Sequence, residues 1–324
     1  MAIKLGNTYL PIGLFLAPMA GYTDRAMRLV AREWGAEHTT TEMISAKAVV
    51  YNDKKTMLLA RIGKDEGPVS LQLFGSEPEI MAEAAERMSH PVSENHAAPI
   101  AIDINMGCPV KKIYTNGDGS ALMRSPEKIF DIVSATTAAT SLPVTVKIRA
   151  GIDRAHINAV ECALAAEEGG AKAVFVHGRT REQLYGGEAD LAVIAAVKAA
   201  LRVPVIANGD ITSAAAAMRA RLFTGADGIM VGRAAVGNPF VFAEIVAAYD
   251  GCAFSEPTLD VKKEVALRQL RYAVADKGEA VAVAECRKQI ANYFRGFRGA
   301  AVLRGKINSL YTYEEVAREI YELR

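Results

Sequence analysis

Short apolar runs rich in β-branched residues recur along the chain, and this pattern predicts buried parallel strands. Between the runs lie segments rich in Ala and Glu, which are strong helix formers. The interval from one run to the next holds one strand, one helix and two short loops. The eight predicted strands span residues 14–20, 38–43, 69–75, 101–107, 144–150, 173–179, 203–209 and 228–234.

Helix boundaries can be placed in three of the intervening segments. Residues 79–88 form one predicted helix. Ser125 followed by Pro126 predicts the start of a second, with Ser as the cap and Pro at the first helical position. The segment 158–168 predicts a third, which ends at a Gly-Gly pair.

Eight strands alternating with helices form either an open doubly wound sheet or a closed (β/α)₈ barrel. A dinucleotide-binding sheet would need G-x-G-x-x-G after its first strand, and this chain has Ala17-Pro18-Met19-Ala20-Gly21 there. The number of strands and their spacing therefore predict an α/β fold of the TIM-barrel type over residues 1–250. Residues 251–324 lack strand-like alternation and predict a C-terminal domain of three or four helices.

Composition narrows the class of protein without identifying it. The chain has 324 residues, of which 51% are hydrophobic and 23% are charged, as in ordinary globular proteins. No apolar stretch reaches the length of a membrane helix, and the four scattered cysteines contain no C-x-x-C pair. We therefore expect a cytoplasmic protein with neither a structural metal site nor a membrane segment. A net charge of +1 means that any basic surface must be local.

Polar side chains gather at the carboxyl ends of the predicted strands, where barrel enzymes place their active sites. Any one of them could be a paired core residue, but their recurrence on six strands favours a site. They are Gln72, Asn105, Cys108, Lys147, Arg149, His177, Arg179, Asn208, Asp210, Gly232 and Arg233.

The last two strand ends have the composition of a phosphate site. Asn208-Gly209-Asp210 and Gly232-Arg233 combine glycines, which let a ligand approach the backbone closely, with one arginine. Gln72 and Lys147 then predict a redox ring at the other end, since a cation can stabilise a flavin that becomes anionic on reduction. FMN, with one phosphate and one redox ring, fits both ends.

Cys108 lies just past the fourth strand in Gly107-Cys108-Pro109. A lone thiol is most often a buried structural residue, but flanking Gly and Pro at the active end favour catalysis. With no Cys–His–Asn order evident, we expect a general acid with a pKa near neutral rather than a nucleophile.

Three motifs together resemble the tRNA-dihydrouridine synthases, and most closely their bacterial B-type subgroup. They are Ala17-Pro18-Met19-Ala20-Gly21-Tyr22-Thr23-Asp24-Arg25, Asp103-Ile104-Asn105-Met106-Gly107-Cys108-Pro109 and His177-Gly178-Arg179-Thr180-Arg181. The resemblance extends into the tail at Arg287-Lys288 and Leu303-Arg304. Ala26-Met27 and Gln289 depart from the family pattern, and the second departure bears on RNA contacts.

This resemblance implies FMN, NADPH or NADH as reductant, and reduction of a uridine C5–C6 double bond in tRNA or, alternatively, rRNA. It implies that Cys108 is the proton donor and that Asn105 and Arg149 hold the target uracil. The oligomeric state and the modified position stay open. The residues that the resemblance places around FMN are Pro18, Met19, Ala20, Gln72, Lys147, His177, Asn208, Gly209, Asp210, Gly232 and Arg233.

The tail holds a basic window between Cys286 and Lys306, with six basic residues and no acidic one. On a continuous helix, Lys288, Asn292 and Arg295 would share one face, opposite an apolar face. We expect Lys288 and Arg295 to contact RNA phosphates, although an ordinary solvated helix face would look the same.

Two other interpretations of the chain remain open. One is a flavin barrel that acts on a small molecule, like dihydroorotate dehydrogenases or ene-reductases, which would leave the tail unexplained. The other is a non-catalytic RNA-binding scaffold, against which the intact Cys108 and Lys147 weigh.

Overall fold

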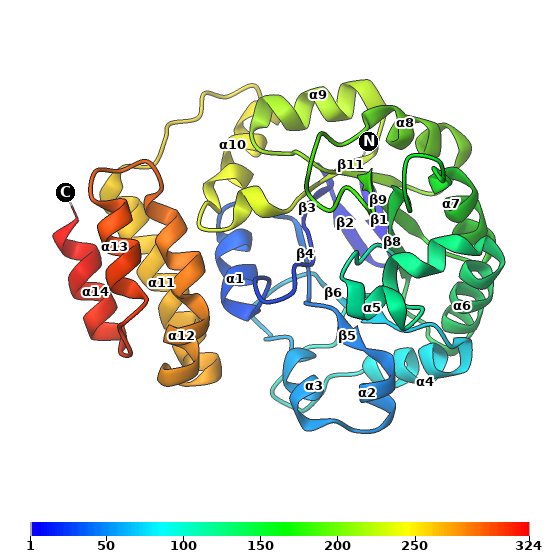
Figure 1. The fold of residues 1–324 in the computed structure, drawn as a ribbon, viewed down its shortest axis with the longest axis horizontal. Coiled ribbons are helices and arrows are strands. Elements are labelled where there is room, and N and C mark those ends of the chain that lie inside the picture. The colour runs from blue at the N-terminus through cyan, green and yellow to red at the C-terminus, as the bar shows by residue number, and fades with distance from the viewer. Residues whose placement is uncertain (1, 324) are drawn as a thin grey trace.

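The computed structural model describes residues 2–323, within which eight parallel strands form a closed barrel surrounded by helices (Figure 1). The ring is closed because the last strand, β11 (Gly228–Val231), pairs with the first, β3 (Leu14–Leu16), and because β4 (His38–Thr40) pairs with β6 (Val69–Phe74). The predicted TIM barrel and all eight predicted strands are confirmed. The strands are β3 (Leu14–Leu16), β4 (His38–Thr40), β6 (Val69–Phe74), β7 (Ala101–Asn105), β8 (Val144–Gly151), β9 (Ala173–Thr180), β10 (Val205–Asn208) and β11 (Gly228–Val231), with the short β5 (Ile44–Ser45) beside β6.

Several strands end earlier than the apolar pattern predicted. The clearest case is β3, which stops at Leu16 rather than at residue 20. Its continuation, residues 17–24, forms a loop that turns back on itself through hydrogen bonds between Met19 and Thr23. Apolarity predicted a buried strand through residue 20. Of residues 17–20 in this loop at the barrel rim only Ala17 is buried, whereas Pro18 and Met19 are half-buried and Ala20 is exposed.

The barrel is enclosed by helices whose buried faces pack on the outward-facing strand residues. Ser125 caps α6 (Pro126–Ala139) by accepting from the Lys128 amide, and α7 (Ala159–Glu168) is followed by its cap Gly169, as predicted. The helices are α1 (Arg25–Glu33), α2 (Ala46–Val50), α3 (Lys54–Leu59), α4 (Pro78–Met88), α5 (Lys111–Thr115), η1 (Gly119–Arg124), α6 (Pro126–Ala139), α7 (Ala159–Glu168), α8 (Leu191–Ala200), α9 (Ala214–Thr224), η2 (Arg233–Ala235) and α10 (Phe240–Tyr249).

A short antiparallel hairpin precedes the barrel and was not predicted. It consists of β1 (Ile3–Leu5) and β2 (Thr8–Leu10), joined by a turn in which Gly6 has a φ of 59°. Its apolar side chains join Phe15 and Phe175 in a buried cluster inside the barrel. The available signal was a Gly-Asn pair between two short apolar runs, a hairpin signature that is easily overlooked when each strand has only three residues.

The tail packs against the barrel through a shared apolar core. Ala26 and Val30 of α1 and Phe240 of α10 belong to the same buried cluster as the tail helices. The Phe240 ring lies edge-on to Trp34 at 4.5 Å, and 6.2 Å from Tyr293 of the tail. The tail elements, beside α1 and α10 in Figure 1, are α11 (Leu259–Lys277), α12 (Glu279–Ile290), η3 (Ala291–Phe294), α13 (Ala300–Ile307) and α14 (Tyr313–Glu322).

The expectation that Lys288, Asn292 and Arg295 share one face of a continuous helix is wrong. The α-helix α12 ends at Ile290 and a 3₁₀ turn follows; two glycines, Gly296 and Gly299, then take left-handed φ values of 91° and 88°. Such backbone favours glycine and interrupts a helix. The basic residues of this window therefore do not share one helical face.

Two kinds of feature are absent from residues 2–323. No helix in that range is long and apolar enough to cross a membrane. No group of three or more His, Cys, Asp or Glu side chains within it could hold a metal ion. The cytoplasmic location remains a prediction.

The shared core leads to a stability prediction. Phe240 is only 2% exposed, so Phe240→Ala should lower the free energy of unfolding by about 3–5 kcal/mol. Phe223→Ala is the matched control, because Phe223 is 61% exposed and its loss should cost little. Urea unfolding of both variants measures the difference, and equal midpoints would contradict the shared core.

Candidate active site

The carboxyl ends of the barrel strands surround a cavity of ≈ 730 Å³. This volume lies in the range of small-molecule and cofactor sites, about 300–1,000 Å³. Arg179 lies outside its lining, but the other barrel residues singled out from the sequence all line it. They are Pro18, Met19, Ala20, Gln72, Asn105, Cys108, Lys147, Arg149, His177, Asn208, Gly209, Asp210, Gly232 and Arg233.

A hydrogen-bonded polar layer crosses the barrel beneath the cavity. Gln72, Asp103 and Thr145 occupy paired positions on β6, β7 and β8. Gln72 Nε2 donates to Asp103 Oδ2 at 2.7 Å, and Thr145 Oγ1 donates to Asp103 Oδ1 at 2.6 Å. Asn105 Nδ2 donates to Gln72 Oε1 at 2.8 Å. From the sequence we expected the whole Gln72 amide to be available to a ligand. In the barrel, one of its N–H groups and one lone pair of its oxygen are already used by Asp103 and Asn105.

Asp103 organises this layer. Burial raises the pKa of its carboxyl from 3.8 to about 6, although the hydrogen bonds from Thr145 and Gln72 oppose the shift. The bonds of Asp103 fix the Gln72 amide, which in turn fixes the orientation of Asn105.

Lys147 and His177 present polar atoms to the cavity without partners. Neither side chain has a hydrogen bond or ion pair among residues 2–323. Burial, with nearby Arg149, lowers the pKa of Lys147 to about 8. Burial and the surrounding cations also hold the pKa of His177 well below 6.5, so its imidazole is neutral near pH 7. A half-buried ammonium without a counter-ion favours a ligand that carries or gains negative charge.

Cys108 is held in a fixed loop beside this ammonium. Asn105 Oδ1 accepts from the Cys108 amide at 2.8 Å, and the Ser120 hydroxyl donates to the Cys108 carbonyl at 2.8 Å. Burial raises the pKa of the thiol above 9.0. The sequence expectation of a pKa near neutral is therefore wrong, because Arg149 and Lys147 do not outweigh the loss of solvent. The thiol therefore keeps its proton at pH 7. A general acid needs this protonated form, whereas a nucleophilic cysteine would need to be a thiolate.

Arg149 is 3% exposed and is largely occupied by backbone carbonyls. Its Nε donates to Gly107 O at 2.8 Å, while Nη1 donates to Thr180 O at 2.9 Å and Leu184 O at 3.1 Å. These bonds tie the Cys108 loop to the loop after β9. Arg149 therefore shapes the cavity wall in addition to any ligand contact.

The strand ends predicted to bind phosphate come together at the other side of the cavity. Asn208 Nδ2 donates to Met230 O at 2.9 Å, which joins β10 to β11. Gly209 has a φ of 120°, and a Cβ there would lie 2.6 Å from Ala189, so the fold itself requires glycine. A Cβ on Gly232 would meet nothing closer than 3.8 Å, which leaves open space for a ligand above this residue.

Asp210 and Arg233 differ in how strongly the protein engages them. Asp210 forms an ion pair with buried Arg179 at 2.8 Å and accepts from the Ala189 amide. Burial alone would raise its pKa, but these partners hold it below 3.8. Arg233 is 55% exposed at its side chain, lies over the Tyr185 ring at 4.5 Å and is 3.8 Å from Asp210. Its guanidinium remains accessible from the cavity.

Some cavity residues were not predicted from the sequence. Met43 ends a predicted strand, and Tyr185 and Thr212 follow predicted strands. None of the three carries a charge that would have marked it. Tyr22 belongs to the motif of residues 17–25, but it was not predicted to line the site. Asn292 belongs to the tail and reaches the cavity only because η3 packs on the loop at Gly237, which no local pattern shows.

The tail residues predicted to bind substrate lie outside the cavity lining. Lys288 is exposed and its Nζ lies 4.2 Å from the centre of the Tyr22 ring. Arg295 is exposed and has no partner among the described residues. Gln289 is 2% exposed and donates to the Tyr22 carbonyl, so it does not itself reach RNA.

Comparison with known proteins decides the family. The model of the family "Dihydrouridine synthase (Dus)" matches residues 15–322, nearly the whole chain. The chain belongs to the dihydrouridine synthase family. It is 40% identical to tRNA-dihydrouridine synthase B of Pseudomonas aeruginosa over 310 residues, which covers 95% of this chain and 91% of that protein. It is 38% identical to the probable tRNA-dihydrouridine synthase of Treponema pallidum, over 92% of this chain and 88% of that protein.

Similarity among solved structures is looser. A mandelate oxidase variant with benzaldehyde matches with a TM-score of 0.46 and 22% identity, over 86% of this chain and 77% of that one. A likeness of this extent has no bearing on function. The predicted family, and with it the class of oxidoreductase that makes dihydrouridine, is confirmed by the family match.

The state of the thiols can be tested by alkylation. At pH 8, iodoacetamide should modify exposed Cys252 first and Cys108 more slowly, because burial raises the pKa of Cys108 and leaves little thiolate. Cys162 and Cys286, each with a pKa of about 12, should be protected. Peptide mass spectrometry measures the order, and faster labelling of Cys108 than of Cys252 would show an activated thiolate instead.

Proposed function

We propose that this enzyme reduces the C5–C6 double bond of specific uridines in tRNA to 5,6-dihydrouridine, with FMN as bound cofactor and NADPH or NADH as reductant. The observation that carries the proposal is one cavity that holds both the protonated Cys108 thiol and the Lys147 ammonium, which has no partner in the described part of the chain. The names of the relatives, tRNA-dihydrouridine synthases, support tRNA as the RNA.

The cavity fits FMN at both ends. The open space above Gly232, the accessible Arg233 guanidinium and the Asn208-Gly209 turn would hold the phosphate. Gln72, Lys147 and His177 would hold the ring, with Pro18, Met19 and Ala20 against it from the loop after β3. Bound there, FMN supplies a two-electron carrier that a nicotinamide cofactor can reduce and that can give a hydride to uracil C6.

The chain's own residues then account for the proton. Cys108 holds a proton at Sγ and can give it to uracil C5, after which the thiolate is neutralised from solvent. Arg149 and Lys147 stabilise that thiolate, since both cations favour the charged form of Cys108. Asn105 fixes the Cys108 loop through its amide bond and is therefore a positioning residue.

A uridine can reach this cavity only if it leaves its RNA stack. The phosphates around it then need a surface outside the barrel mouth. We assign that role to residues 251–324 as an RNA-binding domain, with exposed Lys288, Arg295, Arg298 and Arg304 as its cations. Arg287 and Lys306 are occupied elsewhere, by the Leu310 carbonyl and by Glu319 respectively.

The test is a reaction with purified protein, FMN, NADPH and tRNA that lacks dihydrouridine. Nucleoside mass spectrometry should show dihydrouridine that depends on the enzyme. Parallel reactions with rRNA and with NADH decide the substrate and reductant. A flavin-containing protein that modifies neither RNA but reduces a small enone or orotate would favour the small-molecule alternative, and a preparation without flavin would favour a scaffold.

Cys108→Ala should separate the two half-reactions. The variant should bind FMN and oxidise NADPH like wild type, because the thiol serves only proton transfer to the pyrimidine. RNA reduction should fall about 10²–10⁴-fold, the usual contribution of a general acid. Stopped-flow flavin spectra and dihydrouridine yield measure the two steps, and near-normal dihydrouridine formation would remove Cys108 from the mechanism.

Arg295→Glu combined with Arg298→Glu should weaken RNA binding at least about tenfold and make the log–log salt dependence shallower, by roughly one unit for each phosphate that is no longer neutralised. Both side chains are exposed and form no ion pair within residues 2–323, so folding and FMN content should not change. Lys306→Met, which removes a cation already paired with Glu319 at 2.7 Å, is the matched control. Unchanged affinity and slope would show that this surface is only solvated.

A further inference from the structure

A buried chain of hydrogen bonds runs from the tail core to the cavity loop after β3. Tyr293 Oη donates to Gln269 Oε1 at 2.6 Å, and Gln269 Nε2 donates to Gln289 Oε1 at 2.7 Å. Gln289 Nε2 then donates to the backbone carbonyl of Tyr22 at 3.2 Å. The three tail side chains are only 1–2% exposed. Every donor in the chain therefore points toward the barrel.

Tyr22, where this chain ends, lines the cavity and is contacted twice by α12. Gln289 binds its carbonyl, and the preceding residue, Lys288, places Nζ 4.2 Å from its ring centre. Two consecutive residues of one helix thus constrain both the backbone and the side chain of Tyr22. The ring cannot swing outward without breaking the cation–π interaction.

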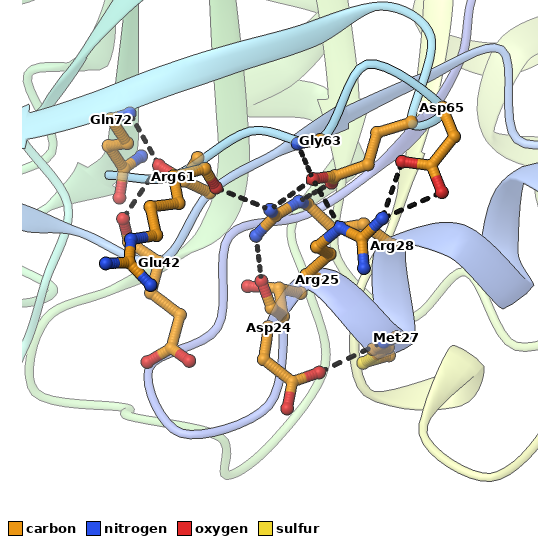
Figure 2. Close-up of polar contacts among 12 residues, drawn as sticks. Asp24, Arg25, Met27, Arg28, Glu42, Arg61, Gly63, Asp65 and Gln72 are labelled. Atoms are coloured by element: carbon orange, nitrogen blue, oxygen red, sulfur yellow. Dashed lines mark hydrogen bonds and ion pairs between the residues drawn. The ribbon is translucent and has the colours of Figure 1, made fainter. Parts of the chain in front are cut away.

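The rest of the loop is held from both sides. From the tail, Lys277 Nζ pairs with Asp24 at 2.7 Å; burial would lower the pKa of this ammonium, but Asp24 and Glu285 raise it. From the barrel, Arg28 Nη1 donates to Thr23 O at 2.9 Å, and Glu42 accepts from the Gly21 amide at 2.6 Å. Figure 2 shows Asp24, Arg28 and Glu42 around this loop. The tail thus supplies contacts that the barrel does not.

We propose that Gln289 is a positioning residue of the active site: through the Tyr22 carbonyl it fixes the loop of residues 17–24, so that the tail completes the cavity wall. Its consequence for turnover rests on the proposed dihydrouridine synthase activity. The side chain must both accept from Gln269 and donate to Tyr22, which a neutral amide does. Loss of either group leaves a buried polar atom unpaired.

The first experiment needs neither cofactor nor RNA. Hydrogen–deuterium exchange should show the amides of residues 17–24 exchanging at least about fivefold faster in Gln289→Met than in wild type. Tyr272→Phe is the matched control, because it removes the 2.6 Å bond from Tyr272 to Glu33 at the same tail–barrel contact without touching this loop. Equal exchange in Gln289→Met and wild type, or equal acceleration in both variants, would overturn the proposal.

A second pair of variants guards against loss of folding. Tyr293→Phe removes only the first bond of the chain and should accelerate the same amides by a smaller factor. Gln289→His should restore slow exchange, since a neutral imidazole offers one donor and one acceptor. If both variants are folded, but Tyr293→Phe does not accelerate exchange and Gln289→His does not restore slow exchange, the proposal is also overturned.

Activity then distinguishes this proposal from the function on which it rests. Gln289→Met should weaken FMN binding at least about threefold and lower kcat at least about tenfold, with KM for tRNA within about twofold of wild type, because the exposed cations are intact. A wild-type protein that makes no dihydrouridine but shows the exchange pattern would remove the function and keep the positioning role. Turnover that falls equally in Tyr272→Phe would assign the effect to general loosening of the tail.

Discussion

The buried ion pair between Arg28 and Glu66 is the contact on which both the cavity and the tail depend. Arg28 Nε lies 2.6 Å from Glu66, whose other oxygen accepts from the Gly63 amide. The same guanidinium holds Thr23 O. Removal of one partner from such a pair costs about 3–5 kcal/mol, because it leaves an uncompensated buried charge. This pair fixes the orientation of α1, which begins at the cavity loop and carries the surface on which the tail packs.

The electrostatics of the cavity follow from burial as much as from residue type. Lys147, Arg149 and Arg233 place three cations around it, while Asp210 is already paired with Arg179 and His177 is neutral. The excess of positive charge favours an anionic ligand. The same positive charge stabilises the Cys108 thiolate that forms when the thiol gives up its proton. Cys108 can then be protonated again from solvent.

The barrel fold and most of the residues that line its cavity could be predicted from the sequence, because a parallel barrel brings the carboxyl ends of all its strands to one rim. Once the apolar runs were recognised, the polar residues that follow them, such as Gln72, Lys147 and Arg233, had to meet. The contacts between residues that are far apart in the sequence could not be predicted. Nothing local shows that Gln72 already bonds Asp103, or that the predicted RNA-facing helix breaks after Ile290. Burial, which set the Cys108 pKa above the expected value, is likewise a property of the folded chain.

The tail's position also has a consequence for biosynthesis. Arg268 of α11 pairs with Glu33 of α1 across 235 positions of sequence, and Ala26 and Val30 are covered by tail helices. At about 5–20 residues per second, the ribosome needs roughly ten to fifty seconds after α1 has emerged to synthesise the chain as far as the tail helices that cover it. During this interval the nascent barrel exposes an apolar strip that only its own last residues can bury. A chain cut short before α11 would keep that strip in water, where it would favour aggregation and recruit chaperones.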